Sequence, residues 1–197
     1  MFEHDEDNLV HSLNQHLINK KEKESISLVE KYPFLLEESL SSYGATIFHY
    51  AVLYGNYTVV DYLIHEQIID IHQIDEDGEN AFSYAMYITT KDNGKMMKKL
   101  YNSGISIHHI NQDGYSLIMS SAINDRLNSL EFFIENGADL NYESSDGNSL
   151  LSILEIGSSQ INISFFMKHL DKFSEKNQKR LKKLRLKHLV ERGISYE

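Results

Sequence analysis

Short stretches of this chain repeat apolar residues at three- and four-residue steps, which is the spacing of an amphipathic helix. Over residues 7–31 the spacing predicts a pair of helices, with Asp7 as the amino-terminal cap of the first. The second helix is expected to end before Pro33, because the residue that precedes a proline is held away from helical backbone angles. The same spacing predicts further helices over residues 46–54, 58–66, 95–102 and 174–192, the last one capped by Ser174 and followed by Gly193.

Glycine and its neighbours recur with a regular period. Gly44, Gly78, Gly114 and Gly147 each open a similar stretch of sequence, and successive glycines are 34, 36 and 33 residues apart. A period near 33 residues indicates stacked units of two helices each, because one such unit cannot bury its own apolar face. The pattern therefore predicts an all-α fold in which tight turns connect one helix pair to the next.

The unit that begins near Tyr43 resembles an ankyrin repeat. The residues that match the family pattern are Thr46, His49, Ala51, Gly55, Val59, Val60, Leu63 and Ile64. The resemblance implies that His49 is a structural histidine, whose ring forms hydrogen bonds within the layer of turns. The chain departs from the pattern in two ways. Ser83 replaces the histidine in the second unit, and the proline that usually follows the helix cap is missing from every unit, which predicts looser helix starts.

The resemblance implies an ankyrin-repeat solenoid of stacked helix pairs joined by hairpin-like loops. We expect about four repeats between Gly44 and Leu170, within a single domain that spans residues 1–197. A solenoid needs polar ends, because its inner repeats are apolar on both sides. The expected parts are a degenerate repeat that serves as the amino-terminal cap (1–42), the repeats (43–170) and an extra carboxyl-terminal capping helix (171–197).

The composition is that of an ordinary globular protein, with 41% hydrophobic residues and a formal charge of −10. The chain has no cysteine, which excludes disulfide and thiolate chemistry. No apolar run approaches the roughly 18 residues that a membrane-spanning helix needs. The acidic amino end lacks the order of a secretion signal, basic and then apolar. We therefore expect a cytoplasmic protein, with secretion by a signal-free route as the alternative.

Charge is unevenly spread along the chain. Residues 1–167 carry 25 acidic and 9 basic side chains, whereas residues 168–192 carry 3 acidic and 10 basic ones. The simplest interpretation of the basic segment is a capping helix with a solvated basic face. The alternative is a contact with nucleic acid or an acidic membrane, which the acidic remainder of the chain would oppose by repelling phosphate groups. We therefore expect no nucleic-acid partner.

The chain carries no recognisable motif for catalysis or metal binding. It has no Gly-x-Ser-x-Gly, no phosphate-binding glycine loop and no His-Glu-x-x-His. Three of its ten histidines, His4, His11 and His16, lie on or near the first predicted helix, but no acid or cysteine spacing completes a zinc site around them. We therefore expect a protein that is not an enzyme and that uses no cofactor and no metal.

Ankyrin arrays bind proteins through loop tips and the exposed side of their first helices, and the resemblance transfers this surface to the present chain by position. The candidate partner-binding residues are Tyr43, Leu53, Tyr54, Glu76, Asp77, Glu79, Tyr87, Ile88, Asp113, Tyr115, Ile123 and Asn124. Large apolar and aromatic residues at these positions favour a contact surface, because such residues dominate binding energy. The alternative is that several of them pack under the loops as ordinary repeat core.

The resemblance and the charge together predict a protein-binding module that is monomeric when free. Its acidic concave face and loop tips are expected to dock a basic partner protein, and no small-molecule substrate is expected. Small free-standing ankyrin proteins of this kind resemble inhibitors, including immunity proteins that neutralise a toxin. The alternative is an adaptor or pathogen effector that bridges several proteins.

Overall fold

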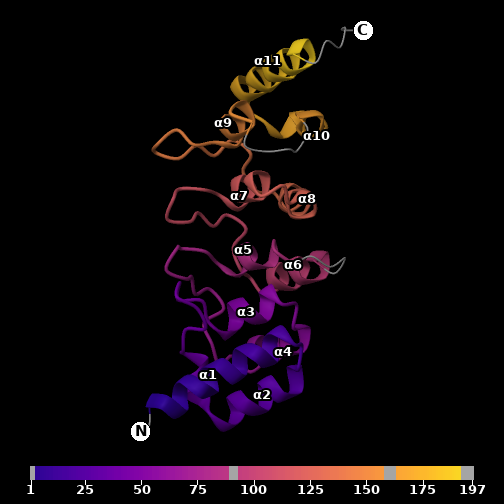
Figure 1. Ribbon diagram of the computed structural model, residues 1–197. Helices are drawn as coiled ribbons and strands as arrows, with labels where there is room; N and C mark the ends of the chain where they lie inside the picture. Colours follow the sequence, from indigo (N-terminus) through magenta and orange to yellow (C-terminus); the bar gives the residue numbers. More distant parts are fainter. Residues whose placement is uncertain (1–2, 89–92, 158–162, 192–197) are drawn as a thin grey trace. The chain divides into compact units, whose positions relative to one another are not determined.

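The structure is a computed structural model that describes residues 3–88, 93–157 and 163–191 (Figure 1). These residues form helices, turns and an isolated β-bridge, with no strand among them, in agreement with the predicted all-α class. They fall into two compact units, Met1–Gln112 and Asp113–Glu197, which are described separately below. The single domain expected over residues 1–197 stays a prediction. Gly193, predicted to follow the last helix, lies outside the described residues.

The first unit begins with the helix pair α1 (Glu3–Ile18) and α2 (Glu22–Lys31), which pack against each other. The prediction that Asp7 caps the first helix is wrong. The chain is already helical at Glu3, so Asp7 lies exposed inside α1. The predicted end of the second helix is confirmed, since Pro33 begins a 3₁₀ turn, η1 (Pro33–Leu36), directly after α2.

Two further helix pairs follow in the first unit. They are α3 (Ile47–Leu53) with α4 (Tyr57–His65), and α5 (Ala81–Ala85) with α6 (Asn93–Asn102). The predicted boundaries of α3, α4 and α6 are correct to within two residues. The first helices of the two pairs, α3 and α5, also pack against each other. Ala51 on α3 and Ala85 on α5 have no exposed surface, and short side chains of this kind allow helices to approach closely.

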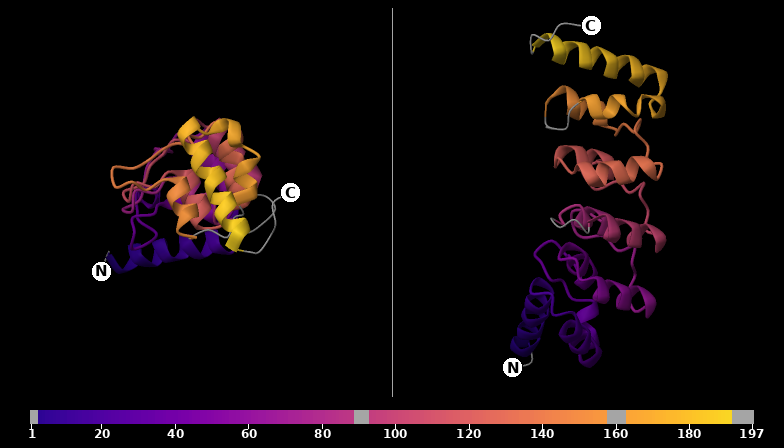
Figure 2. Two further views of the ribbon diagram at one scale, coloured as in Figure 1. Left: turned by 90° about the horizontal axis from the view of Figure 1, so that it is seen from above. Right: turned by 90° about the vertical axis from the view of Figure 1, so that its right-hand side faces the viewer.

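The second unit repeats this arrangement. Its elements are α7 (Leu117–Ile123), α8 (Leu127–Glu135), α9 (Leu150–Glu155), α10 (Ile163–Met167), the 3₁₀ turn η2 (Leu170–Lys172) and α11 (Glu175–Glu191). Helix α7 packs against α8 and α9, and α11 packs against α9 and α10 (Figure 2). Ser116 caps α7 and Ser149 caps α9, because each hydroxyl accepts a backbone N–H from the first helical turn.

The recurring glycines turn the chain in the loops between helix pairs. Gly44, Gly78, Gly114 and Gly147 have φ angles of +73°, +74°, +77° and +79°, in the left-handed region. Successive loops of the first unit lie side by side, since the N–H of Glu76 donates to the carbonyl oxygen of Tyr43 (2.8 Å). A Cβ atom added to Gly78 would lie 2.9 Å from the backbone nitrogen of Gln112 in the next loop. The repeat period therefore has a physical cause, because the left-handed backbone angle disfavours a side chain at all four glycines and the loop contact adds to this at Gly78.

Gly78→Ala is expected to lower the free energy of unfolding by about 2–3 kcal/mol, because it combines left-handed strain with a steric contact. Urea unfolding followed by circular dichroism measures the loss. Gly104→Ala separates the two causes, since Gly104 has a φ of +89° but no atom within 4 Å of the added Cβ. It should cost about 1–2 kcal/mol. Gly94→Ala, in α6 with open space around it, should be neutral or stabilising by up to about 1 kcal/mol. A Gly78→Ala loss no larger than that of Gly104→Ala would show that the loop contact contributes nothing.

Candidate functional site

A pocket of about 240 Å³ lies in the first unit, where the end of α3 meets α5 and the loop before α5. Its lining residues are Leu53, Asp75, Glu79, Ser83, Tyr84, Met86 and Tyr87. Leu53, Glu79 and Tyr87 were predicted from the sequence as partner-binding residues, and the fold brings them together from two successive helix pairs. The other four were not predicted. The pocket places two carboxylates beside an apolar and aromatic wall.

Asp75 organises the loop at this pocket and is only 7% exposed. Its Oδ1 accepts the backbone N–H groups of Asp77 (3.0 Å) and Glu79 (2.8 Å). Its Oδ2 accepts the hydroxyl of Tyr84 on α5 (2.5 Å). A side-chain oxygen that accepts from amides a few residues later holds its own turn in shape. Asp75 thereby couples the loop to the helix that follows it.

The same device recurs in other loops, three residues before the loop glycine. The Oγ of Ser41 accepts the N–H groups two and four residues later, at 3.2 and 3.1 Å. In the second unit, the Oγ of Ser144 accepts the N–H of Asn148 at 3.0 Å. A polar residue three positions before each of these glycines is the sequence signal that marks Asp75, which was not among the predicted residues.

Glu79 and Tyr84 complete the polar side of the pocket. The carboxylate of Glu79 accepts the hydroxyl of Ser83 with one oxygen and the side-chain amide of Asn111 with the other, at 2.7 Å for the amide. Burial, together with the hydrogen bond to Asp75, raises the pKa of Tyr84. Tyr84 therefore keeps its proton and remains a donor to Asp75.

His49 on α3 is fully buried and lies against this network, with its ring centroid 4.7 Å from that of Tyr84. Its Nδ1 accepts the backbone N–H of Thr46 (3.2 Å), and its Nε2 donates to the carbonyl oxygen of Gln73 (3.3 Å). An amide N–H only donates and a carbonyl only accepts, so the ring is neutral with its proton on Nε2. Burial lowers the pKa of His49, and the nearby charge of Asp75 opposes this only partly. The bonds agree with the structural role that the family resemblance implied.

Acidification is expected to destabilise the protein through His49. The lowered pKa means that the unfolded chain takes up the proton first, so stability is present above the usual histidine pKa of 6.5 and falls as the pH decreases below it. One proton contributes a slope of at most about 1.4 kcal/mol per pH unit. Urea unfolding at several pH values between about 7.5 and 5 measures this slope. His49→Asn should flatten it, whereas the exposed control His72→Asn should not. Equal slopes for wild type and His49→Asn would contradict the assignment.

The predicted surface residues of the first unit include four that are well exposed. Tyr43 is 59% exposed and Tyr87 is 43% exposed. Glu76 and Asp77, in the loop that pairs with Tyr43, are also exposed. Aromatic side chains at this exposure are candidates for a protein contact, because they offer a large rigid area with a polar tip.

The remaining first-unit candidates are less accessible. Leu53 is half-buried and faces the pocket. Tyr54 is half-buried against the ring of Tyr50, with ring centroids 5.6 Å apart, and burial raises its pKa. Ile88 is only 8% exposed, because an aliphatic side chain without a polar atom gains free energy by leaving water. Ile88 therefore belongs to the core and contributes little to any contact surface.

The second unit, taken by itself, holds the other four predicted residues. Asp113 and Asn124 are exposed, whereas Tyr115 and Ile123 are half-buried. The side chain of Asn124 donates to the carbonyl oxygen of Ser120 (2.9 Å) at the end of α7, which gives it a local structural role. The participation of these four residues in binding stays a prediction.

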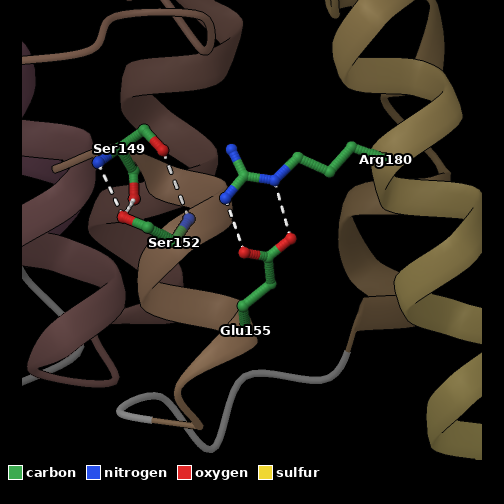
Figure 3. Close-up of polar contacts among 4 residues, drawn as sticks. All are labelled: Ser149, Ser152, Glu155 and Arg180. Carbon is green, nitrogen blue, oxygen red and sulfur yellow. Dashed lines mark hydrogen bonds and ion pairs between the residues drawn. The ribbon is translucent and has the colours of Figure 1, made fainter. Parts of the chain in front are cut away.

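The basic carboxyl-terminal segment forms α11, close to the predicted range 174–192. Arg180 on α11 holds Glu155 on α9 through two parallel bonds, Nε to Oε1 at 2.6 Å and Nη2 to Oε2 at 2.5 Å (Figure 3). The hydrogen bonds from Arg180 hold the pKa of Glu155 below its usual value. The two side chains are 32% and 36% exposed, so the pair contributes only about 0.5–1 kcal/mol and mainly orients α11. Ser149 and Ser152 form the capping box that begins α9 beside this pair (Figure 3).

One face of α11 remains open to solvent. Leu181 is fully buried on the packed face, while Lys176, Lys179, Lys182 and Lys183 are exposed. Asn141 secures the start of the helix, since its Oδ1 accepts the N–H of Ser174 (2.8 Å). The arrangement is compatible with the simplest interpretation from the sequence, a packed helix with a solvated basic face.

Metal ligands do not cluster in the part of the chain that the structure describes, where no three His, Cys, Asp or Glu side chains are placed to hold an ion. Among the helices of this part, none is both long and apolar enough to cross a bilayer. The functional description therefore rests on the pocket and on the exposed loop residues.

Comparison with known families adds one finding. Residues 43–73 match the family model for the ankyrin repeat. This segment is therefore similar to an ankyrin repeat. It contains α3 and α4, and with them the buried His49, and it ends two residues before Asp75. The resemblance is thereby confirmed for the first repeat, and no match to a curated protein was found. Ankyrin repeats are generally protein–protein interaction modules.

Proposed function

We propose that this protein is a non-enzymatic binding module whose first unit docks a basic partner protein. The observation that carries the proposal is the exposure of Tyr43, Glu76 and Asp77 in the loops and of Tyr87 in the turn that follows α5. These are the positions through which ankyrin arrays contact proteins. The proposed surface also includes Leu53 and Tyr54 at the end of α3 and Glu79 in the pocket, whereas the buried Ile88 is left out.

The charge of the first unit supports a basic partner. Residues 1–112 carry 17 acidic and 8 basic side chains, a net charge of −9. Residues 113–197 carry 12 acidic and 11 basic side chains, a net charge of −1. Exposed carboxylates speed the encounter with a basic protein, while buried aromatic contacts supply most of the affinity once the complex forms. The tyrosines and the acids therefore have separate roles in this proposal.

We further propose that binding masks a functional surface of the partner, so that the protein acts as an inhibitor, with immunity against a toxin as one form of this role. The helix pairs of each unit would be layers of an ankyrin solenoid, with α1 and α2 closing the first unit and α11 closing the second. A cytoplasmic monomer stays a prediction from the sequence. The adaptor or effector role and a contact through the basic face of α11 stay its alternatives.

Affinity capture from native lysate, analysed by mass spectrometry, tests the proposal. The test variant is Tyr43→Ala/Tyr87→Ala/Asp77→Lys, in which all three residues are exposed. The matched control is Tyr101→Ala/Glu131→Lys, which removes an exposed tyrosine and reverses an exposed charge on the second helices α6 and α8. One basic protein that is retained by wild type and control and lost by the test variant is the expected result. Circular dichroism confirms that each variant is folded.

Other outcomes are equally informative. A partner that the test variant retains would exclude the first-unit surface and move the contact elsewhere on the chain. Several weak partners would favour an adaptor over an inhibitor. A single purified partner then allows the masking role to be tested directly, since an inhibitor forms a stoichiometric complex that abolishes the partner's activity.

A further inference from the structure

The pocket of the first unit has a chemistry that the family resemblance did not predict. Leu53, Met86 and Tyr87 contribute apolar and aromatic surface, and Glu79 and Asp75 contribute carboxylates. Long basic side chains have the complementary arrangement, because a lysine or arginine carries a cation at the end of an aliphatic stem. The stem of such a side chain can lie along apolar walls while its head reaches a carboxylate or the face of a tyrosine ring.

The two carboxylates of the pocket lack a cationic partner among the residues that the structure describes. Within residues 3–88, 93–157 and 163–191, Glu79 accepts the hydroxyl of Ser83 and the amide of Asn111, and Asp75 accepts backbone N–H groups and the hydroxyl of Tyr84. Negative charge that is partly withdrawn from water is unfavourable unless a cation compensates it. A cation that enters from outside therefore binds more favourably here than beside a fully exposed carboxylate.

Other kinds of ligand fit the pocket less well. An anion would be repelled by both carboxylates. A metal ion would need further ligands, and the described residues hold no group of three that could supply them. A purely apolar side chain would leave the carboxylates facing it without water or a counter-charge.

We infer that this pocket receives a lysine or arginine side chain of the partner protein, with its cationic head at Glu79 and its aliphatic stem against Leu53, Met86 and Tyr87. The inference rests on the proposed function, because it assigns the anchor through which the first unit recognises a basic partner. It also gives a role to Tyr87, which lines the pocket and is exposed.

Titration with small probes tests the pocket without a partner. Backbone amide shifts are followed by ¹⁵N NMR during addition of N-acetylarginine amide or N-acetyllysine amide. N-acetylcitrulline amide and N-acetylnorleucine amide serve as uncharged controls of similar shape. We expect saturable shifts at Glu79, Ser83 and Tyr87 with the cationic probes. The neutral probes should bind at least about tenfold more weakly, because they cannot form a charge-assisted hydrogen bond.

Glu79→Gln and Glu76→Gln form a matched pair of variants. Each removes one negative charge from the same loop, but only Glu79 lines the pocket. Glu79→Gln should weaken the cationic probes about tenfold, whereas Glu76→Gln should change their binding less than about twofold. Tyr87→Ala, at an exposed position, is a second pocket variant that is expected to fold normally and to weaken binding as well.

Three results would overturn the inference: no shifts at the pocket amides, equal binding of the citrulline probe, or equal weakening by the two glutamate variants. The first two would show that the pocket does not select a cation, and the third that only net charge matters. A partner that is lost by the surface triple variant but bound normally by Glu79→Gln would leave the proposed function standing without this anchor. If the cationic probes bind in the pocket but no partner is captured, the pocket's selectivity for a cation would stand and the proposed function would lose its support.

Discussion

Phe82→Ala is expected to lower the free energy of unfolding by about 3–5 kcal/mol, the largest effect predicted for a single substitution in this chain. Phe82 lies on α5, is fully buried and is among the largest side chains with no exposed surface. Helix α5 packs against both α3 and α6, so the cavity would open where the last two helix pairs of the first unit meet. A loss of this size is a large part of the stability of a typical domain.

Urea unfolding followed by circular dichroism measures this loss. Phe82→Leu is the milder control, because it keeps most of the apolar volume and should cost less than about half as much. Phe133→Ala removes a fully buried side chain of the same type from α8 in the second unit. If both alanine variants shift one common transition, the chain unfolds as the single domain that was expected from the sequence. If each variant shifts a different transition, the two units are separately stable. A loss below about 1 kcal/mol for Phe82→Ala would contradict the packing described for α5.

Asp75→Ala is expected to cost about 2–4 kcal/mol, although it removes no apolar contact of comparable size. The substitution leaves two backbone N–H groups and the hydroxyl of Tyr84 without the acceptor that now satisfies them. These hydrogen bonds are part-buried, so water would replace the lost acceptor only incompletely. The loop between α4 and α5 should therefore lose its fixed shape, and with it the pocket.

Two milder variants divide this effect into its parts. Asp75→Asn keeps an oxygen for the backbone N–H groups and should cost no more than about 1–2 kcal/mol. Tyr84→Phe removes only the hydroxyl bond and should cost about 1 kcal/mol. Urea unfolding measures stability, and hydrogen exchange of the amides of Asp77 and Glu79 measures the loop itself. An unchanged exchange rate in Asp75→Ala would show that the loop does not depend on the carboxylate.

Much of the local structure could be predicted from the sequence. The helix from Tyr57 to His65 was predicted over 58–66, because its apolar residues recur with the helical period. The prediction for the start of the first helix was wrong, because Glu3–Glu6 carry no apolar periodicity that would mark them as helical. The capping role of Asn80 at α5 was also missed, although a polar residue directly before a helix is its usual signal.

The candidate site was predicted less completely. Position within a repeat identified Leu53, Glu79 and Tyr87, but the same reasoning included Ile88, which the structure buries. Repeat position describes where the backbone of a residue lies, and it does not tell which way a side chain points at the end of a short helix. Exposure depends on which neighbouring helices cover that side chain, and this is a property of the packed unit.

The sequence by itself determined the helical class of this protein, the approximate bounds of α3, α4 and α6, and the similarity of residues 43–73 to an ankyrin repeat, because these follow from apolar and glycine periods of a few residues and of about 33 residues. Only the tertiary structure decided that Asp75, Glu79 and Tyr84 form one hydrogen-bonded network beside Leu53. These residues come from a loop and from two different helices, and a network of this kind depends on distances of a few ångströms. Such distances are set only when the helices pack and the buried carboxylate of Asp75 forms its hydrogen bonds.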